Sequence, residues 1–238
     1  MRWIDKSGLP PRALEEYLNN QRPIGVNLDY ESFTRKRELR QELVAHQRGL
    51  CAFTGAAIDD RLGSISPDGH LTSPSGAKLN IKVHNAHLKP QSVCKQEMIA
   101  RNEEPGRSLG EDMDHRNIVA ALLMEGAKEE TFGAAAQINR LLLISPIEPD
   151  CEARFHFAGN GQVQGIGPEA SDTVAILKLC HRTLEGWRRE AIEALIDPAK
   201  ITSISDLEAI IAAMNTSSNG RLPAYCFAIK QVAERLIL

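Results

Sequence analysis

Two strand-like segments, about thirty residues apart, constrain this chain more than any other feature of its sequence. The first alternates apolar and polar residues over 79–84, continues to His87 and is closed by Pro90. The second begins at Asn117 and runs through apolar residues to Leu123. Such alternation is typical of strands, and proline ends a strand because it has no amide hydrogen. We therefore expect two neighbouring strands, one ending near a histidine and the other starting at an asparagine.

The segments around these strands predict how the unit is completed. Residues 64–76 are rich in glycine, proline and serine, which indicates a loop or a loose hairpin. Residues 125–137 are alanine-rich and predict a helix that packs across the two strands. The order strand, loop, strand, helix describes a ββα unit. The fold class we expect is α+β, with this unit embedded in a mainly helical chain.

Helical periodicity and turn signals predict the other elements of the chain. They are helices at 12–18 and around 33–44, a buried strand at 140–146, a hairpin of 153–157 with 162–166, one long helix at 171–196, and helices near 204–214 and 223–237. Three regions follow from this order: an N-terminal helical segment at 1–50, a core at 51–138, and a C-terminal hairpin with helices at 139–238. We expect the last region to dock a partner.

Charge limits the partners that the chain can attract. A net charge of -3 means that the whole molecule does not attract polyanions, so nucleic-acid binding needs a local basic surface. The densest basic run precedes the core, and one more basic residue follows the first strand. These candidates are Arg35, Lys36, Arg37, Arg40 and Lys89. A charged run of this kind is usually a solvated helix face, and both interpretations stay open.

Cysteine usage and hydropathy indicate where the protein works. The five cysteines are scattered and form no C-x-x-C pair, which argues against disulfides and a four-cysteine zinc site. No run approaches the roughly eighteen apolar residues of a membrane span, and the first residues carry no secretory signal. We expect a cytoplasmic protein. The sequence also lacks a phosphate-binding G-x-x-x-x-G-K-[ST] loop, so any nucleotide hydrolysis would come from a partner.

His87 and Asn117 suit the cleavage of a phosphodiester bond. A histidine can activate water, a divalent ion can neutralise the phosphate, and an asparagine can hold the geometry or the ion. The alternative is a hydrogen-bonded core histidine and an asparagine that starts a strand. The upstream segment Cys51-Ala52-Phe53-Thr54-Gly55 is hard to explain by packing alone. Its occurrence together with His87 and Asn117 favours a role in cleavage.

The three segments Cys51–Gly55, Ala86–Pro90 and Asn117–Val119 resemble those of HNH endonucleases. Most of the chain is similar to the HNH component of Septu-type antiphage systems (PtuB-like), which also occurs as an effector in some retron systems. The wider resemblance rests on residues 1–10, 39–51, 149–152 and 175–189. It implies a ββα-metal (HNH) nuclease core and metal-dependent cleavage of DNA or RNA, tRNA included. It also implies as partners an ABC-type ATPase (PtuA-like), nucleic acid and, in retrons, a reverse transcriptase with its non-coding RNA and DNA.

The resemblance implies one divalent ion, Mg, Mn or Zn, with His87 and Asn117 as the catalytic residues. The chain departs from the family pattern at two positions. Ala86 precedes the histidine where an acidic residue is common, and Gly126 stands where a further ligand is expected. Nearby groups that could compensate as metal ligands are His84, Asp114, His115 and Glu125.

Many family members also carry a zinc knuckle of two C-x-x-C pairs. Here Thr54 takes the place of the second cysteine, while Leu122 and Glu125 fall near the other pair. Because Cys51 alone cannot complete a tetrahedral site, we expect no structural zinc and assign Cys51 and Thr54 a structural role. The incomplete ligand set leaves a second function open. In it, the chain is a catalytically degenerate HNH-fold subunit that binds nucleic acid or the ATPase.

Overall fold

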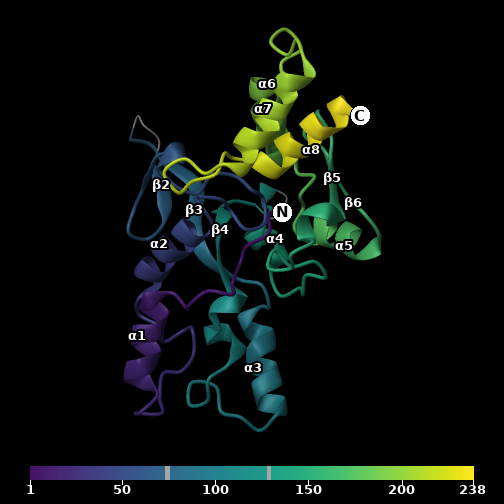
Figure 1. The fold of residues 1–238 in the computed structure, drawn as a ribbon. Helices are drawn as coiled ribbons and strands as arrows, with labels where there is room; N and C mark the ends of the chain where they lie inside the picture. Colours follow the sequence, from purple (N-terminus) through teal and green to yellow (C-terminus); the bar gives the residue numbers. More distant parts are fainter. Residues whose placement is uncertain (73–75, 128–129) are drawn as a thin grey trace.

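The two strands expected from the sequence form the centre of the fold (Figure 1). The computed structural model describes residues 1–72, 76–127 and 130–238. In it, β3 (Lys78–His87) pairs antiparallel with β4 (Ile118–Met124), and His87 lies opposite Ile118. The strand prediction is confirmed, and β3 includes His87 itself.

Two short strands extend this sheet on the side of β3. They are β1 (Ser64–Ile65) and β2 (His70–Thr72), so that the strand order is β1-β2-β3-β4 and every pairing is antiparallel. The loose hairpin predicted for 64–76 is therefore confirmed as far as Thr72, and residues 73–75 lie outside the described residues. The hairpin predicted for 153–157 with 162–166 is also confirmed. It consists of β5 (Phe155–Phe157) paired with β6 (Val163–Gly165).

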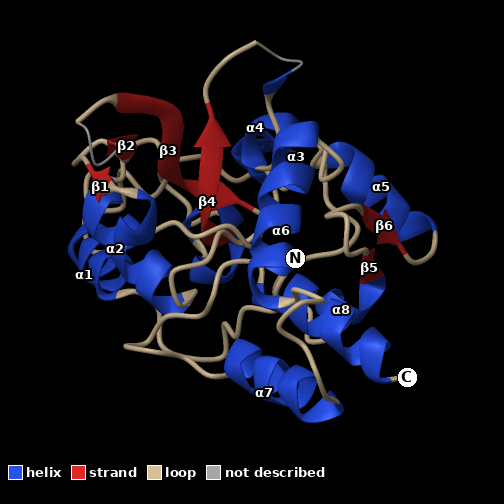
Figure 2. Ribbon diagram, turned by 90° about the horizontal axis from the view of Figure 1, so that it is seen from above, coloured by secondary structure: helices blue, strands red, loops and turns tan. Residues whose placement is uncertain are grey.

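Eight α-helices surround the sheets in the part of the chain that is described (Figure 2). They make the chain a mixed α+β protein. None is long and apolar enough to cross a membrane. The helices are α1 (Arg12–Gln21), α2 (Lys36–His46), α3 (Gln91–Ala100), α4 (Ala134–Gln137), α5 (Pro168–Ile176), α6 (Arg182–Leu195), α7 (Ile204–Asn215) and α8 (Cys226–Ile237).

The helix predicted for 125–137 is wrong over most of its length, because only the single turn α4 forms. Two glycines explain this result. Gly126 has φ +155 and Gly133 has φ +61, conformations that interrupt a helix. Gly133 also forms an antiparallel bridge with Leu123 of β4, so the chain has turned back to the sheet at that point. Residues 128–129 lie outside the described residues. The helix α3, which the sequence did not predict, lies between β3 and β4 in the order of the chain.

Two further predictions are corrected. Residues 140–146 form turns and loop rather than a buried strand, with Leu141 and Leu143 about half exposed. The predicted helix at 171–196 is two helices, α5 and α6. Lys178 has φ +47 between them, and His181 starts α6 by accepting a hydrogen bond from the Thr183 amide through its ring. Helical periodicity continues through this break because both helices bury apolar residues in the same core.

The outer edge of β4 is covered by the segment that follows α2. The Gln47 carboxamide pairs with Ala120 like a neighbouring strand. It accepts from the Ala120 amide at 2.7 Å and donates to the Ala120 carbonyl at 2.7 Å. The Ala52 amide also donates to that carbonyl, and the Leu122 amide reaches Cys51 Sγ at 3.3 Å. A buried strand needs these partners, because unpaired backbone groups are costly away from water.

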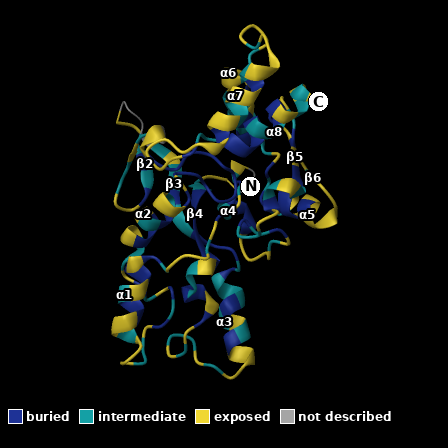
Figure 3. Cartoon of the chain, in the orientation of Figure 1, coloured by how far each residue is buried: buried dark blue, intermediate teal, exposed yellow. Residues whose placement is uncertain are grey.

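One apolar core joins the three regions that the sequence suggested. Buried residues of α2, β4 and α8 belong to the same cluster, including Leu39, Leu122 and Phe227 (Figure 3). Phe227 packs so closely on Gly55 that a Cβ there would lie 2.2 Å from its ring. Gly55 also has φ +73, which glycine adopts without strain. The C-terminal region is thus part of the core that supports the β3–β4 pair.

Replacing Gln47 with Met should destabilise the protein by about 2 kcal/mol, because the buried Ala120 amide would lose its partner. Urea unfolding measures the change. Gln41→Met provides the matched control, since Gln41 is exposed on α2 and should change stability by less than about 0.5 kcal/mol. Equal stabilities of the two variants would contradict the role given to Gln47.

Candidate active site

The candidate site lies where β3 ends and β4 begins. His87 is the last residue of β3, and Asn117 directly precedes β4. The segment between them contains α3. It leaves the sheet after His87 and returns to it at Asn117, and these two points are neighbours because His87 pairs with Ile118 across the sheet. The pairing thus brings together two residues that are thirty positions apart.

Both ring nitrogens of His87 have a partner. Nε2 lies 3.0 Å from the carbonyl oxygen of Asp112, and Nδ1 lies 3.2 Å from the side-chain nitrogen of Gln91. A carbonyl can only accept, so Nε2 carries the hydrogen and Nδ1 accepts from the Gln91 amide. The Tyr30 ring packs on the imidazole in a T-shaped arrangement, with 4.5 Å between the ring centres. His87 is only 7 % exposed, and this burial lowers its pKa to about 4.

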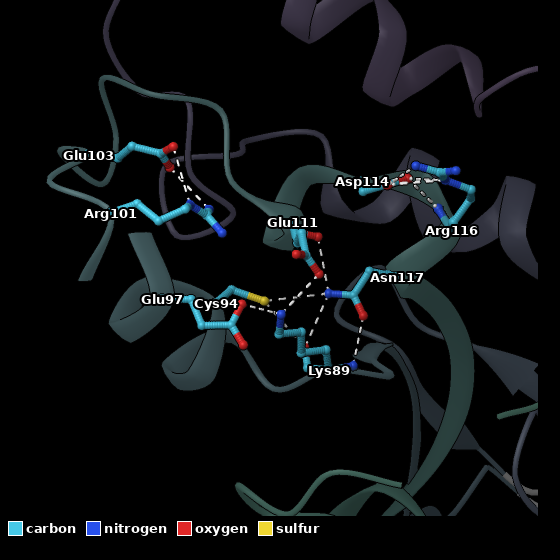
Figure 4. A network of polar contacts seen from close by, with 9 residues as sticks. All are labelled: Lys89, Cys94, Glu97, Arg101, Glu103, Glu111, Asp114, Arg116 and Asn117. Carbon is cyan, nitrogen blue, oxygen red and sulfur yellow. Dashed lines mark hydrogen bonds and ion pairs between the residues drawn. The ribbon is translucent and has the colours of Figure 1, made fainter. Parts of the chain in front are cut away.

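Asn117 fastens the two ends of the intervening segment to each other (Figure 4). Its side-chain oxygen accepts from the Lys89 amide at 2.7 Å. Its side-chain nitrogen donates to the Lys89 carbonyl at 3.1 Å and to the Glu111 carbonyl at 3.0 Å. One buried carboxamide therefore fixes the turn after His87, the approach to β4 and the distance between them.

Lys89 points into an open cavity of about 520 Å³ beside Asn117. Its ammonium group lies between the carboxylates of Glu97 and Glu111, with Glu111 at 3.2 Å (Figure 4). The opposite wall is apolar and comes from the loop at 141–147. The two carboxylates neutralise Lys89 in this structure, so it offers no net attraction to a phosphate until they move or bind something else.

The four residues considered as metal ligands do not surround one point. His84 is three positions before His87 on β3, and side chains at odd spacing point to opposite faces of a strand. Glu125 follows the far end of β4, about 26 Å along the strand from Asn117 at the usual rise of about 3.3 Å per residue. It is held there by His70 at 3.1 Å and Lys82 at 2.8 Å.

Asp114 and His115 lie near Asn117 and contact each other, with 3.5 Å between the Asp114 carboxylate and His115 Nδ1, and each also has a further partner. The Asp114 carboxylate binds the Arg116 guanidinium at 2.7 Å, and His115 Nε2 lies 3.4 Å from the Lys6 carbonyl. Among the described residues, no three His, Cys, Asp or Glu side chains are placed to hold a common ion. The predicted ligands therefore do not form a prebuilt metal site together with His87.

The basic run of α2 is spread over different environments. Arg35 binds the Glu16 carboxylate at 2.5 Å, and Arg40 is buried with its guanidinium on the Pro67 carbonyl. Lys36 donates to the Glu31 carbonyl and lies over the Tyr30 ring. Arg37 is exposed and lines a cavity of about 260 Å³ with Arg40. Of the four, Arg37 is best placed to meet an anion.

Cys51 and Thr54 lie against the strand pair, as a structural role requires. Cys51 Sγ accepts from the Leu122 amide, and the Thr54 methyl group lies 3.5 Å from the position of a Cβ on Gly133. Both side chains are buried. Leu122 is one of the two positions expected near a second pair of zinc ligands. Here its backbone amide donates a hydrogen bond to Cys51 Sγ instead. Glu125, the other position, lies with His70 and Lys82.

Sequence reasoning missed the three residues that enclose His87. Tyr30, Gln91 and Asp112 come from three separate segments, and only Gln91 is close in sequence. Pro90 predicts the end of a strand, but a proline at this position also favours the start of a helix. That second meaning would have revealed α3.

Comparison with known proteins adds no identification. No protein-family model matches the sequence, and no curated protein matches it significantly.

His87, which is buried, and His84, which is partly buried, should make the fold sensitive to mild acid. Burial lowers the pKa values of His84 and His87 to about 4, from 6.5 for a free side chain. Between these values the unfolded chain binds more protons, so stability falls as the pH drops from 6.5 to 4. From pH 7.5 to 5.0 each histidine should cost about 2 kcal/mol.

Urea unfolding at the two pH values measures this loss. His84→Gln and His87→Gln should each remove about 2 kcal/mol of it, since glutamine does not titrate. The exposed Gln96→Met variant should retain the full loss. An identical pH dependence in all four proteins would contradict the assignment.

Proposed function

We propose that the chain is an HNH-type endonuclease that cleaves phosphodiester bonds of DNA or RNA as the effector of an antiphage defence system. The observation that carries this proposal is the arrangement of His87 and Asn117 at one end of the β3–β4 pair. The order of residues in the sequence motivated the same function, and the register of the strands supports it.

The environment of His87 suits a general base. Because Nε2–H is fixed on the Asp112 carbonyl, the lone pair of the neutral ring is on Nδ1. His87 is neutral at pH 7, so Nδ1 can take a proton from an attacking water. The Asn117 carboxamide contributes by holding the backbone of Lys89, which follows His87 by two residues. Asn117 in this proposal positions the base and does not react itself.

The proposal includes one divalent ion, Mg, Mn or Zn, which would stabilise charge on the phosphate. His84, Asp114, His115 and Glu125 do not fit that ion as a set: only Asp114 and His115 lie together, at 3.5 Å, whereas Glu125 lies with His70 and Lys82 beyond the far end of β4. We therefore assign no step to the ion. The nucleic acid itself can bring phosphate oxygens to a site, and Mg²⁺ is often held by few protein carboxylates.

The partners in this proposal follow the family resemblance. They are nucleic acid and an ABC-type ATPase of the same system, or a reverse transcriptase with its non-coding RNA and DNA in a retron. Such a partner would place the protein in the cytoplasm. The loop at 138–143 is a candidate contact with it, because Ile138, Leu141 and Leu143 are at least half exposed.

A second function is favoured by the burial of His87 and the dispersed ligand candidates. In it, the chain is a catalytically degenerate HNH-fold subunit that binds nucleic acid or the ATPase. Cleavage assays on the purified assembly separate the two functions, because only the first requires His87 to titrate and react.

His87→Gln should lower cleavage of plasmid or total RNA by at least about 100-fold, the usual contribution of a general base. Glutamine can still donate to the Asp112 carbonyl, so the fold should survive. His46→Gln is the control, because His46 is exposed at the end of α2. Full activity of His87→Gln would contradict the role given to His87, whereas absence of cleavage by the unmodified assembly would favour the non-catalytic function.

Arg37→Gln should weaken nucleic-acid binding and reduce the salt dependence of its affinity by about one phosphate contact. Arg35→Gln should have a smaller effect, because Glu16 already neutralises Arg35. The affinities of the two variants for nucleic acid are compared between about 50 and about 200 mM salt, a range over which phosphate contacts change the affinity strongly. Equal effects would show that α2 acts only through its total charge.

A further inference from the structure

Gln91 covers the one nitrogen of His87 that could act as a base. Its side-chain nitrogen lies 3.2 Å from Nδ1. Gln91 is the first residue of α3 and follows Pro90, which has no amide hydrogen to offer. Asn117 holds the backbone of Lys89 on the other side of that proline. The backbone before Gln91 is therefore fixed, while the Gln91 side chain is only partly buried and can rotate.

A lone pair that accepts a hydrogen bond from an amide is not available to a water. For Nδ1 to remove a proton, the Gln91 amide must turn away or exchange its donor for its oxygen. The same contact stabilises the neutral ring, because a protonated Nδ1 would have no lone pair to offer. Gln91 can therefore influence both the access to His87 and the pH at which it becomes charged.

We propose that Gln91 is a positioning residue that caps Nδ1 of His87 in the resting protein and leaves it when nucleic acid binds. This inference rests on the proposed function of His87 as a base. It explains how a reactive histidine can lie in a fold that otherwise keeps it covered. The cap is a single side chain, so its release needs no movement of α3.

The other groups that face His87 do not supply this control. The Tyr30 ring contacts the imidazole in a T-shaped arrangement, and the Asp112 carbonyl accepts a hydrogen bond from Nε2. The Asp112 carboxylate is turned to the Tyr30 amide at 2.8 Å. Lys36 and His84 act on the ring only by charge at a distance. Gln91 is thus the residue whose substitution addresses Nδ1 alone.

Gln91→Glu tests the contact because a carboxylate would accept a hydrogen from Nδ1 and favour the charged ring. The pKa of His87 should then rise by about one unit or more, a tenfold change in its protonation equilibrium. NMR titration of the histidine ring signals measures it without nucleic acid. Gln96→Glu is the matched control, since Gln96 is exposed on the same helix. An unchanged His87 titration in Gln91→Glu would overturn the inference.

A second measurement avoids acidic solution. Diethyl pyrocarbonate modifies unprotonated imidazole nitrogens, and peptide mass spectrometry locates the product. At pH 7, Gln91→Ala should speed modification of His87 about fivefold, the effect of losing a hydrogen bond of about 1 kcal/mol. Gln96→Ala should leave the rate as in the unmodified sequence. Equal rates in both variants would also overturn the inference.

Cleavage separates this inference from the proposed function. In single-turnover reactions at subsaturating nucleic acid, which report the capped free protein, the acidic limb of the pH profile should shift upward in Gln91→Glu by as much as the His87 titration. At saturating nucleic acid, where the cap has left, the limb should lie where it does in the unmodified sequence. A limb that stays unshifted at subsaturating nucleic acid, or is shifted equally at saturation, would overturn the cap and leave the nuclease intact. Cleavage that survives in His87→Gln would overturn the proposed function itself, whatever the titration shows.

Discussion

The carboxamide of Asn117 is the contact on which the arrangement of the candidate site depends. It binds the amide and the carbonyl of Lys89 and the carbonyl of Glu111 at the same time. The strand pairing alone would align His87 with Ile118, but it would not fix the chain beyond the last pair. With Asn117 in place, the turn after His87 and the start of β4 form one rigid corner. Both the chemistry proposed for His87 and the cap proposed for Gln91 need that corner.

Gln47 applies the same principle on the other side of β4. A primary amide carries one acceptor and two donors, so it can substitute for the edge of a strand where the chain cannot supply one. Two buried carboxamides thus satisfy backbone groups beside β4: Gln47 at its outer edge, and Asn117 in the turn after β3. A lysine or a glutamate could not do this without burying an unpaired charge.

Local periodicity and turn signals in the sequence were enough for β3 and β4, for α1 and α2, and for the hairpin of β5 with β6. It failed where backbone conformation outweighed composition. Gly126 and Gly133 interrupt an alanine-rich segment, and Lys178 with φ +47 divides a continuous amphipathic pattern. The apolar run at 140–146 has no strand beside it. Such features depend on tertiary contacts, which windows of sequence do not contain.

For the site, the sequence identified His87 and Asn117 but not the residues that determine what His87 can do. Tyr30 and Asp112 reach His87 from distant segments, and nothing in their own neighbourhoods marks them. The metal-ligand candidates were chosen by proximity in sequence, whereas strand alternation and length separate His84 and Glu125 from His87 in space.

The hydrogen bonds of Asn117 hold the two ends of the segment from Leu88 to Asn117 together, and this has a practical consequence. Because the two ends of this segment are already held together, lengthening the turn at 101–104 adds only the entropic cost of a longer loop. That cost is about 0.6 kcal/mol of stability for each doubling of the loop length. That turn is therefore a suitable place for a reporter or an affinity tag that leaves His87 undisturbed.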